Sequence, residues 1–196
     1  MFSGSMNHED GRIAVGIARK TIELWITSKE RFRPEKYPKA FDEPGGVFVT
    51  IHTYPGKELR GCIGFPEPRF PLIKALVDAA MASTQDPRFP PLQRNELKGI
   101  LVEVSVLTKP EPVRVRKPEE YPRKIRIGTD GLIVRKGFHS GLLLPQVAAE
   151  HNLDEREFLM HTCLKAGLPP LAWMGRGVEI FRFQSAIFSE SEPGKI

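Results

Sequence analysis

Hydrophobic side chains recur at helical spacing in three segments of the chain. Over residues 12–29 the apolar positions fall on one side of a helix and the charged positions on the other, and Asp10 is placed to cap its first turn. Residues 71–85 predict a second helix that starts with a proline, whose missing N–H is no loss in the first turn. Residues 153–167 predict a third helix, capped at its end by Gly167.

Other segments show the two-residue alternation of strands. Residues 46–54 and 58–65 are rich in β-branched and apolar residues, are separated by a Pro-Gly turn, and predict an antiparallel hairpin. Residues 99–110 predict the clearest strand, because valine occupies every second position in its centre. Residues 124–137 predict two short strands joined at an Asp-Gly turn, and residues 178–188 predict a last alternating strand.

The predicted strands gather in hairpin-like groups and do not alternate one by one with helices. This order predicts an α+β protein, in which antiparallel or mixed sheets are flanked by helices, and it argues against a doubly wound parallel sheet. We expect one domain over residues 12–188, with a flexible N-terminal tail at residues 1–11 and a C-terminal tail at residues 189–196.

The composition is that of a soluble protein with a hydrophobic core, since 40% of its 196 residues are hydrophobic and 27% are charged. The start of the chain lacks the basic segment and apolar stretch of a secretory signal. There are two cysteines and no C-x-x-C or H-x-x-x-H spacing, so we expect a reducing cytoplasm, no disulfide framework and no local zinc motif. The net charge of +5 permits an anionic partner, such as RNA or a phosphorylated metabolite, without demonstrating one.

The segment LRGCIG, residues 59–64, is the first candidate for chemistry. In a strand, Arg60, Cys62 and Gly64 would share one face, so the guanidinium would lower the pKa of the thiol. The glycines would expose the backbone to a ligand or to another strand. The structural alternative is that the cysteine packs like a small hydrophobic residue and that a glycine marks a bulge. The residues alone favour this second interpretation.

Two further segments carry candidate polar groups. In DPRFPPL, which cannot continue a helix, Asp86 and Arg88 either hold a local turn or stand at the rim of a cleft, where the guanidinium would bind a carboxylate or phosphate. In VEVSVL, Glu103 and Ser105 share one face of a strand. If that face is buried, Glu103 needs a partner such as Arg60 or Arg88; if it lines a cleft, Glu103 is a candidate general acid or base; otherwise it is simply solvated.

The remaining polar features are weaker. Gln146 in GLLLPQV has an amide that would form hydrogen bonds with a polar ligand, unless the segment is only an irregular entry into the last helix. Cys163 lies on an apolar helical stripe and is predicted to be core. A loose basic cluster is more typical of a solvated connector than of a nucleic-acid site; it comprises Arg114, Arg116, Lys117, Arg123, Lys124 and Arg126. No phosphate-binding, metal or other cofactor motif is present, so the residues predict a fold class and a candidate site but no reaction.

Taken in chain order, the segments LRGCIG, DPRFPPL, VEVSVL, DGLIV, GLLLPQV and FLMHTCLKAGL resemble the AMMECR-type domain family over about residues 12–188. The resemblance implies an archaeal α+β protein with two unequal subdomains around a cleft that LRGCIG borders. Some family members occur with Memo-like and radical-SAM proteins, which implies RNA modification, whereas eukaryotic relatives are regulatory or scaffold-like. The resemblance places the family's proposed site on Leu59, Arg60, Gly61, Cys62, Ile63 and Gly64. From the motifs above we add Asp86, Arg88, Glu103 and Gln146.

Two functional hypotheses remain open. In the first, an enzyme acts on RNA or a small anionic molecule, with Cys62 as nucleophile or redox thiol, Arg60 as its activator, and Glu103 or Asp86 as the acid or base. In the second, a non-catalytic regulatory or adaptor domain binds a protein partner through the same surface. Arg60 then supplies recognition, and Cys62 is only a tightly fitting side chain. The first hypothesis requires a thiol of low pKa that a reagent can reach.

Overall fold

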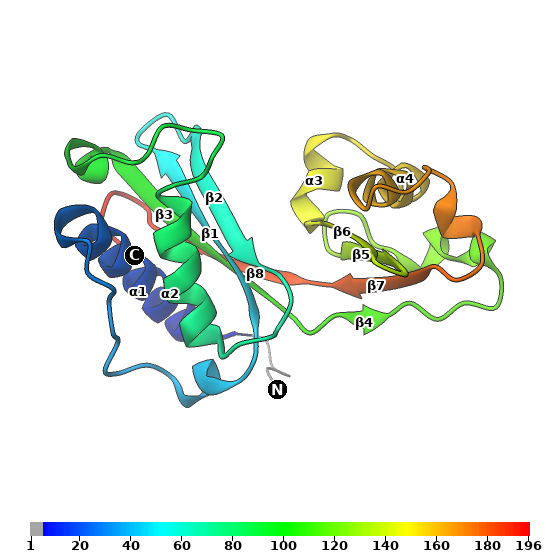
Figure 1. Cartoon of the computed structure of the whole chain (residues 1–196), viewed down its shortest axis with the longest axis horizontal. Helices are drawn as coiled ribbons and strands as arrows, with labels where there is room; N and C mark the ends of the chain where they lie inside the picture. The colour runs from blue at the N-terminus through cyan, green and yellow to red at the C-terminus, as the bar shows by residue number, and fades with distance from the viewer. Residues whose placement is uncertain (1–5) are drawn as a thin grey trace. The chain divides into compact units, whose positions relative to one another are not determined.

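The computed structural model describes residues 6–196 and divides the chain into two compact units (Figure 1). The first unit runs to Lys109 and resumes at Ala186–Ile196, and the second unit comprises Pro110–Ser185. The first unit is therefore built from both ends of the sequence. The observed class is α+β, as predicted, and each unit contains helices and its own sheet.

In the first unit, two helices cover one face of a four-stranded sheet (Figure 1). The strand order is β2-β1-β3-β8, and β1 pairs antiparallel with both β2 and β3. The predicted hairpin is thereby confirmed. The elements of this unit are α1 (His8–Ser28), η1 (Lys39–Asp42), β1 (Gly46–Thr53), β2 (Leu59–Phe65), α2 (Leu72–Ser83), η2 (Arg94–Gly99), β3 (Ile100–Leu107) and β8 (Ser185–Ser189).

The second unit has a smaller sheet with the strand order β4-β7-β5-β6, in which the pairings are antiparallel. Its core is formed mainly by α4, β5 and β7 and includes Cys163, which is fully buried, as predicted. The elements of this unit are β4 (Glu111–Pro112), η3 (Pro118–Glu120), η4 (Pro122–Lys124), β5 (Gly131–Lys136), β6 (His139–Leu143), α3 (Pro145–Glu150), α4 (Glu155–Lys165), η5 (Ala172–Met174) and β7 (Glu179–Phe183).

Alternation along β1 and β3 gives the first sheet two different faces. On β3, Val102, Val104 and Val106 are buried in the core beneath the helices, whereas Glu103 and Ser105 point to the opposite face because successive side chains of a strand alternate. The sequence of β1 alternates in the same way. The face opposite the helices therefore carries Glu103 and Ser105 beside the buried apolar Leu101 and Leu107, and the candidate site lies there.

The first helix begins earlier than its apolar pattern predicts. Its cap is Asn7, whose side-chain oxygen accepts a hydrogen bond from the Asp10 N–H at 2.8 Å. The prediction that Asp10 is the cap is wrong, because Asp10 lies within the first turn, where a negative charge opposes the helix dipole favourably. Residues 8–11 of the predicted N-terminal tail thus belong to α1, and residues 1–5 of it lie outside the described residues.

The other two predicted helices are present with shifted ends. Pro71 immediately precedes α2, and Asp154 caps α4 through a reciprocal box with Glu157, in which each side chain accepts a hydrogen bond from the other's backbone N–H. Among residues 6–196, no helix combines the length and the apolar composition needed to cross a bilayer.

The strand prediction for residues 124–137 is half wrong. Residues 127–129 form a turn, which Asp130 holds by accepting a hydrogen bond from the Arg126 N–H at 3.0 Å with its buried carboxylate. Only β5 forms, and its hairpin partner is β6, on the other side of the turn at Gly137. A side chain that satisfies the backbone locally ends the strand, although the apolar alternation continues through it.

The last predicted strand is divided between two sheets. At Gln184 the chain passes from β7, in the second sheet, to β8, in the first. One alternating sequence thus forms two strands. Alternation indicates an extended chain, but it does not determine which strands pair with it. The segment with Gln146 forms the short helix α3, not the irregular entry that was one of its two alternatives.

A buried ion pair joins α1 to the segment after β8. Arg19 donates a hydrogen bond from Nε to Glu190 at 2.7 Å and another from Nη2 to the same carboxylate. Its guanidinium also donates to the backbone oxygens of Leu97 and Ile100, while Glu190 accepts the Val102 N–H at 2.9 Å. Glu190 is 3% exposed, so the segment predicted as a C-terminal tail is in part anchored in the first unit.

Candidate functional site

Polar side chains from three strands lie together on the side of the first sheet opposite the helices. Thr50 on β1 lies opposite Cys62 on β2 and opposite Glu103 on β3, so these three residues form one row across the sheet. His52 and Ser105 lie on the same side, two residues along their strands. We call these five residues the polar face. The structure thereby brings Cys62 and Glu103, which were predicted separately, into the same row.

The thiol of Cys62 is half-buried next to Thr50, whose hydroxyl donates a hydrogen bond to Sγ at 3.3 Å. Burial raises the pKa of the Cys62 thiol, because the thiolate loses solvation. The Thr50 hydroxyl and the Arg88 charge oppose this rise without cancelling it. The expectation of a lowered pKa is therefore wrong, and the cation that acts on the thiol is Arg88, not Arg60.

Asp86 and Arg88 clamp the free edge of β2. The Asp86 carboxylate accepts the Cys62 N–H at 2.9 Å, and Arg88 donates from Nη2 to the Cys62 carbonyl oxygen at 3.3 Å. The two side chains also bind each other, with Nε and Nη2 of Arg88 at 3.0 and 2.6 Å from the carboxylate. The pair thus occupies both backbone groups that Cys62 presents at the sheet edge, where another strand would otherwise pair.

The two members of this clamp differ in accessibility. Asp86 is 2% exposed, and the hydrogen bond from Arg88 holds the pKa of its carboxyl well below the ordinary value. The Arg88 side chain is 57% exposed. Among the described residues, its side-chain hydrogen bonds use Nε and Nη2 and none uses Nη1. Asp86 is thus a positioning group, and Arg88 is the member that a ligand can reach.

Arg60 is committed to a different partner. Its guanidinium donates to Glu96 at 2.8 and 3.1 Å in the bidentate geometry that arginine and carboxylate prefer. Burial alone would raise the pKa of Glu96, but the hydrogen bond and charge of Arg60 and the hydrogen bond from the Gln93 N–H together outweigh it and lower that pKa. Glu96 lies 36 residues further along the chain and was not predicted. Arg60 therefore joins η2 to the sheet edge.

Gly61 and Gly64 of LRGCIG each lie where a side chain would collide with another segment of the protein. A Cβ on Gly61 would lie 2.3 Å from the backbone oxygen of Ser83, at the end of α2. A Cβ on Gly64 would lie 2.4 Å from the ring of Phe48, on the neighbouring strand. Real Cβ atoms do not approach other atoms so closely, so only glycine allows both contacts. The alternative that the glycines serve the packing of the chain's own segments fits both positions.

Leu59 and Ile63 do not share a face as simple alternation predicts. Ile63 is half-buried opposite Val49, whereas the pairing shifts between Ile51 and His52 and places Leu59, which is 41% exposed, opposite His52. Such an irregularity adds a residue to one strand and turns the following side chain to the other face.

His52 is the functional candidate that the sequence analysis missed. Its Nε2 lies 3.9 Å from a carboxylate oxygen of Glu103, and its Nδ1 is buried with no hydrogen-bond partner among the described residues. The signal was present in the alternation of residues 46–54, in which Thr50 and His52 oppose the valines. Glu103 thus lies next to His52, whereas Arg60 and Arg88, its two expected partners, form ion pairs with Glu96 and Asp86.

Gln146 belongs to the second unit, at the start of α3. Its side-chain oxygen Oε1 is buried and has no hydrogen-bond partner within residues 6–196. Its role as a ligand contact remains a prediction. In the same described part of the chain, no group of three histidine, cysteine or acidic side chains is arranged to hold a metal ion.

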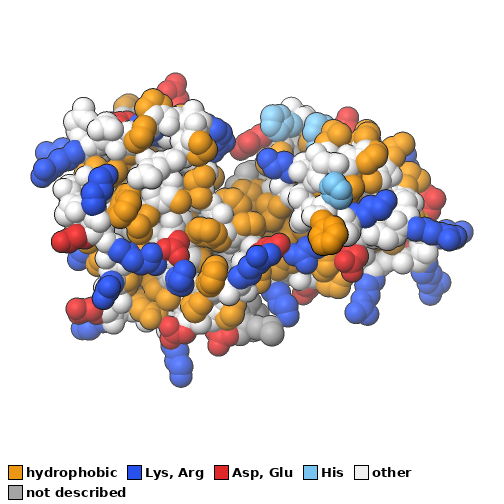
Figure 2. Space-filling model, viewed as in Figure 1, with side chains coloured by type: hydrophobic (Ala, Val, Ile, Leu, Met, Phe, Trp, Pro, Cys, Tyr) orange, Lys and Arg blue, Asp and Glu red, His pale blue; other side chains and the backbone are white. Residues whose placement is uncertain are grey.

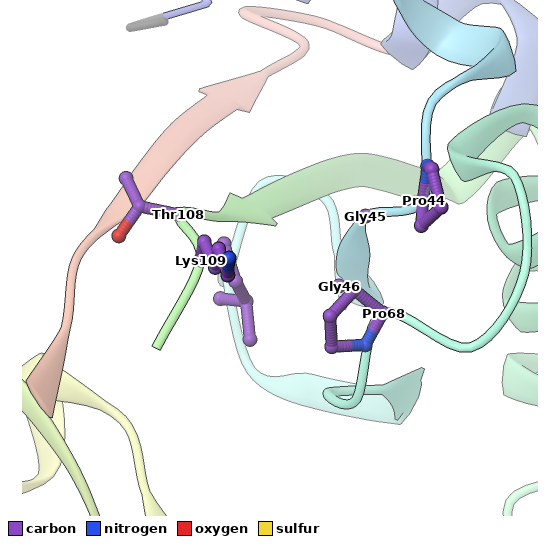
Figure 3. Close-up of a pocket in the computed structure, with 7 residues that line it drawn as sticks. Pro44, Gly45, Gly46, Pro68, Thr108 and Lys109 are labelled. Atoms are coloured by element: carbon purple, nitrogen blue, oxygen red, sulfur yellow. The ribbon is translucent and has the colours of Figure 1, made fainter. Parts of the chain in front are cut away.

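A separate apolar hollow of about 150 Å³ opens at the other end of the first sheet, where β1 begins and β3 ends. Figure 3 shows Pro44 and Pro68 on one side of it and Lys109 on the other. It is remote from Cys62 along both strands. Its lining is mostly proline, glycine backbone and Leu107, so it has few polar side chains that could bind a ligand specifically.

The raised pKa of Cys62 predicts slow alkylation at neutral pH. In a Cys163→Ala variant, the rate of iodoacetamide labelling should reach half its maximum at a pH above the ordinary thiol value of about 8.5. The reason is that the thiolate, which burial disfavours, is the species that reacts. The same variant unfolded in urea provides the control. A midpoint in the folded protein at or below that of the unfolded protein would contradict the prediction.

These features define an α+β protein with a polar sheet face beside a clamped edge strand. The family model described as AMMECR1 matches residues 15–188, and the chain belongs to this family. The resemblance seen in the sequence is thereby confirmed.

The relatives are archaeal proteins that match nearly end to end. Protein MJ0810 of Methanocaldococcus jannaschii is 55% identical over 186 residues, which cover 94% of this chain and 92% of the relative. Protein MK0488 of Methanopyrus kandleri is 50% identical over 187 residues, which cover 94% and 90%. The crystal structure of the uncharacterized protein PH0010 from Pyrococcus horikoshii is similar with a TM-score of 0.89 and 46% identity, covering 97% of this chain and 96% of that one.

Proposed function

We propose that the polar face of the first sheet binds a small polar ligand and that Cys62 contacts this ligand as a neutral thiol. The observation that carries the proposal is the row Cys62–Thr50–Glu103, which crosses three strands on the face opposite the helices and has a half-buried side chain at each end. A sheet holds such side chains at fixed spacing, so a ligand meets preorganised groups.

The two ends of the row differ in charge and indicate the chemistry of the ligand. At the Cys62 end, the exposed guanidinium of Arg88 donates hydrogen bonds, which suits a carboxylate, a phosphate or a carbonyl group. At the other end, the Glu103 carboxylate accepts hydrogen bonds, and His52 lies beside it. A molecule with an anionic group at one end and an amino or amide group at the other matches both.

Two features favour binding over the alternatives considered from the sequence. A nucleophilic Cys62 needs its thiolate, which burial disfavours. A protein partner that adds a strand to β2 meets the Asp86–Arg88 clamp, which occupies the Cys62 backbone groups. RNA modification and partners of the Memo-like or radical-SAM type stay predictions, as does a cytoplasmic location.

The proposal is tested by adding three probes at millimolar concentration to the isotopically labelled full chain and recording amide chemical shifts. L-glutamate and AMP carry both kinds of group, and inorganic phosphate carries only the anionic one. We expect L-glutamate or AMP to shift the amides of residues 50, 52, 62 and 103, and to bind more tightly than phosphate. Glu103→Gln should weaken that binding by about tenfold, the loss of about 1.4 kcal/mol.

The control is Glu192→Gln, which removes an exposed carboxylate elsewhere in the first unit. If neither two-ended probe shifts the polar face, or if Glu103→Gln binds as well as the unchanged chain, the proposal is overturned. Glu103→Gln keeps the shape of the side chain, so its folding is checked by the unchanged amide spectrum of the core.

A further inference from the structure

A second hollow lies in the second unit, between the end of β6 and the helices α3 and α4. It has a volume of about 410 Å³, within the range of pockets that hold small molecules. Figure 2 shows histidine, basic and hydrophobic side chains gathered on the side of this unit that carries α3 and α4. The hollow is lined by Leu143, Val147, His151, Leu153, His161 and Lys165.

Three of these side chains form an apolar floor. Leu143, Val147 and Leu153 come from β6, α3 and the link between the helices, and each remains half-exposed. Leu143 and Leu153 pack against the buried core of the unit, so the floor is held from beneath. Half-exposed apolar side chains at the bottom of a hollow gain free energy when a ligand excludes water from them.

The other three side chains form a rim of hydrogen-bond donors. His161 and Lys165 are four residues apart on α4 and therefore share one helix face, and His151 follows α3. Among residues 6–196, none of these three side chains makes an ion pair or a side-chain hydrogen bond. An imidazole can donate a hydrogen bond whether or not it is protonated. The rim can therefore bind an anion in either protonation state of the two histidines.

Carboxylates do not compensate this rim. No acidic side chain lines the hollow. Glu157, one helical turn before His161, is engaged as the capping partner of Asp154 at 2.9 Å. A rim of hydrogen-bond donors that includes the Lys165 cation, above an apolar floor, has the two-part design of a site for an amphipathic anion.

We propose that this hollow binds a small molecule with an apolar body and one anionic group, such as an aromatic or short-chain phosphate, sulfonate or carboxylate. The apolar body covers Leu143, Val147 and Leu153, and the anionic group binds Lys165 and the two histidines. The site lies within the second unit and does not depend on the function proposed for the polar face of the first.

The experiment uses phenyl phosphate as the probe, with inorganic phosphate and phenol as its two separate parts, and follows amide shifts in the full chain. Phenyl phosphate should shift the amides of α3, of α4 and of the end of β6, and should bind at least about tenfold more tightly than either part, since about 1.4 kcal/mol corresponds to tenfold. His161→Gln with Lys165→Gln should reduce its affinity to that of phenol.

A matched control is Lys136→Gln, which removes an exposed cation of the same unit that does not line the hollow. Its affinity for phenyl phosphate should not change. The proposal is overturned if phenyl phosphate does not bind, or if it shifts only amides away from α3, α4 and the end of β6. It is also overturned if inorganic phosphate binds equally well, or if the double variant binds phenyl phosphate like the unchanged chain. Val147→Glu provides a second test on the floor, because its carboxylate should repel the probe while His161 and Lys165 stay in place.

Discussion

Replacing Glu190 by alanine is expected to lower the free energy of unfolding by about 3–5 kcal/mol, the cost of removing one partner of a buried ion pair. The change leaves the Arg19 guanidinium buried, without the carboxylate that receives two of its hydrogen bonds. It also leaves the Val102 N–H without its acceptor. Urea unfolding of the full chain, followed by tryptophan fluorescence or circular dichroism, measures the change.

Glu192→Ala serves as the control for this experiment. Glu192 is also acidic and lies two residues away, but its side chain is 51% exposed and binds the exposed Lys195, so its loss should cost less than about 1 kcal/mol. Equal losses in the two variants would contradict the argument from burial. The double change Arg19→Met with Glu190→Leu should recover part of the loss, since it removes the unpaired buried charge but leaves the Val102 N–H without its acceptor.

Replacing Gly61 by alanine should destabilise the protein by about 1–3 kcal/mol, and valine should cost more, because the added atoms overpack a tight contact. The new Cβ would lie 2.3 Å from the Ser83 backbone oxygen, and a backbone atom at the end of a helix cannot move aside alone. Moving α2 away from β2 would also disturb Asp86 and its hydrogen bond to Cys62. The midpoint of urea unfolding gives the measurement.

Gly99→Ala is the matched control, because a Cβ at Gly99 meets no atom within 4 Å and its φ is not in the left-handed region. We expect this change to be neutral or slightly stabilising, since alanine restricts the unfolded chain more than glycine does. If Gly61→Ala were as stable as Gly99→Ala, the glycine would have to serve something other than the packing of β2 against α2.

The LRGCIG segment thus has a structural role and a functional one that fall on different residues. Gly61 and Gly64 allow close packing, and Arg60 ties η2 to the sheet through Glu96. The groups that a ligand can reach are the half-buried Cys62 thiol and, from another segment, the exposed guanidinium of Arg88. The hypothesis in which Arg60 supplies recognition is therefore not favoured by the geometry, because its guanidinium is paired with Glu96.

The sequence alone was sufficient for the elements whose pattern is local. The alternation of valine with polar residues predicted β3 and the shared face of Glu103 and Ser105, because side chains of a strand point alternately to either side, and β-branched composition predicted β1. Apolar spacing and a proline start predicted α2 in the same way. Two of the errors, at Asn7 and Asp130, fall where local hydrogen bonds compete with the pattern.

Only the tertiary structure decided which polar groups meet. The Asp86 carboxylate accepts the Cys62 N–H from 24 residues away, and the Glu96 carboxylate accepts hydrogen bonds from Arg60, 36 residues away. It also decided that the cation acting on the thiol is Arg88 and that burial determines the direction of the thiol pKa. Periodicity gives the face on which a side chain lies, whereas its partner and its solvation depend on strand register and on segments that are distant in the sequence.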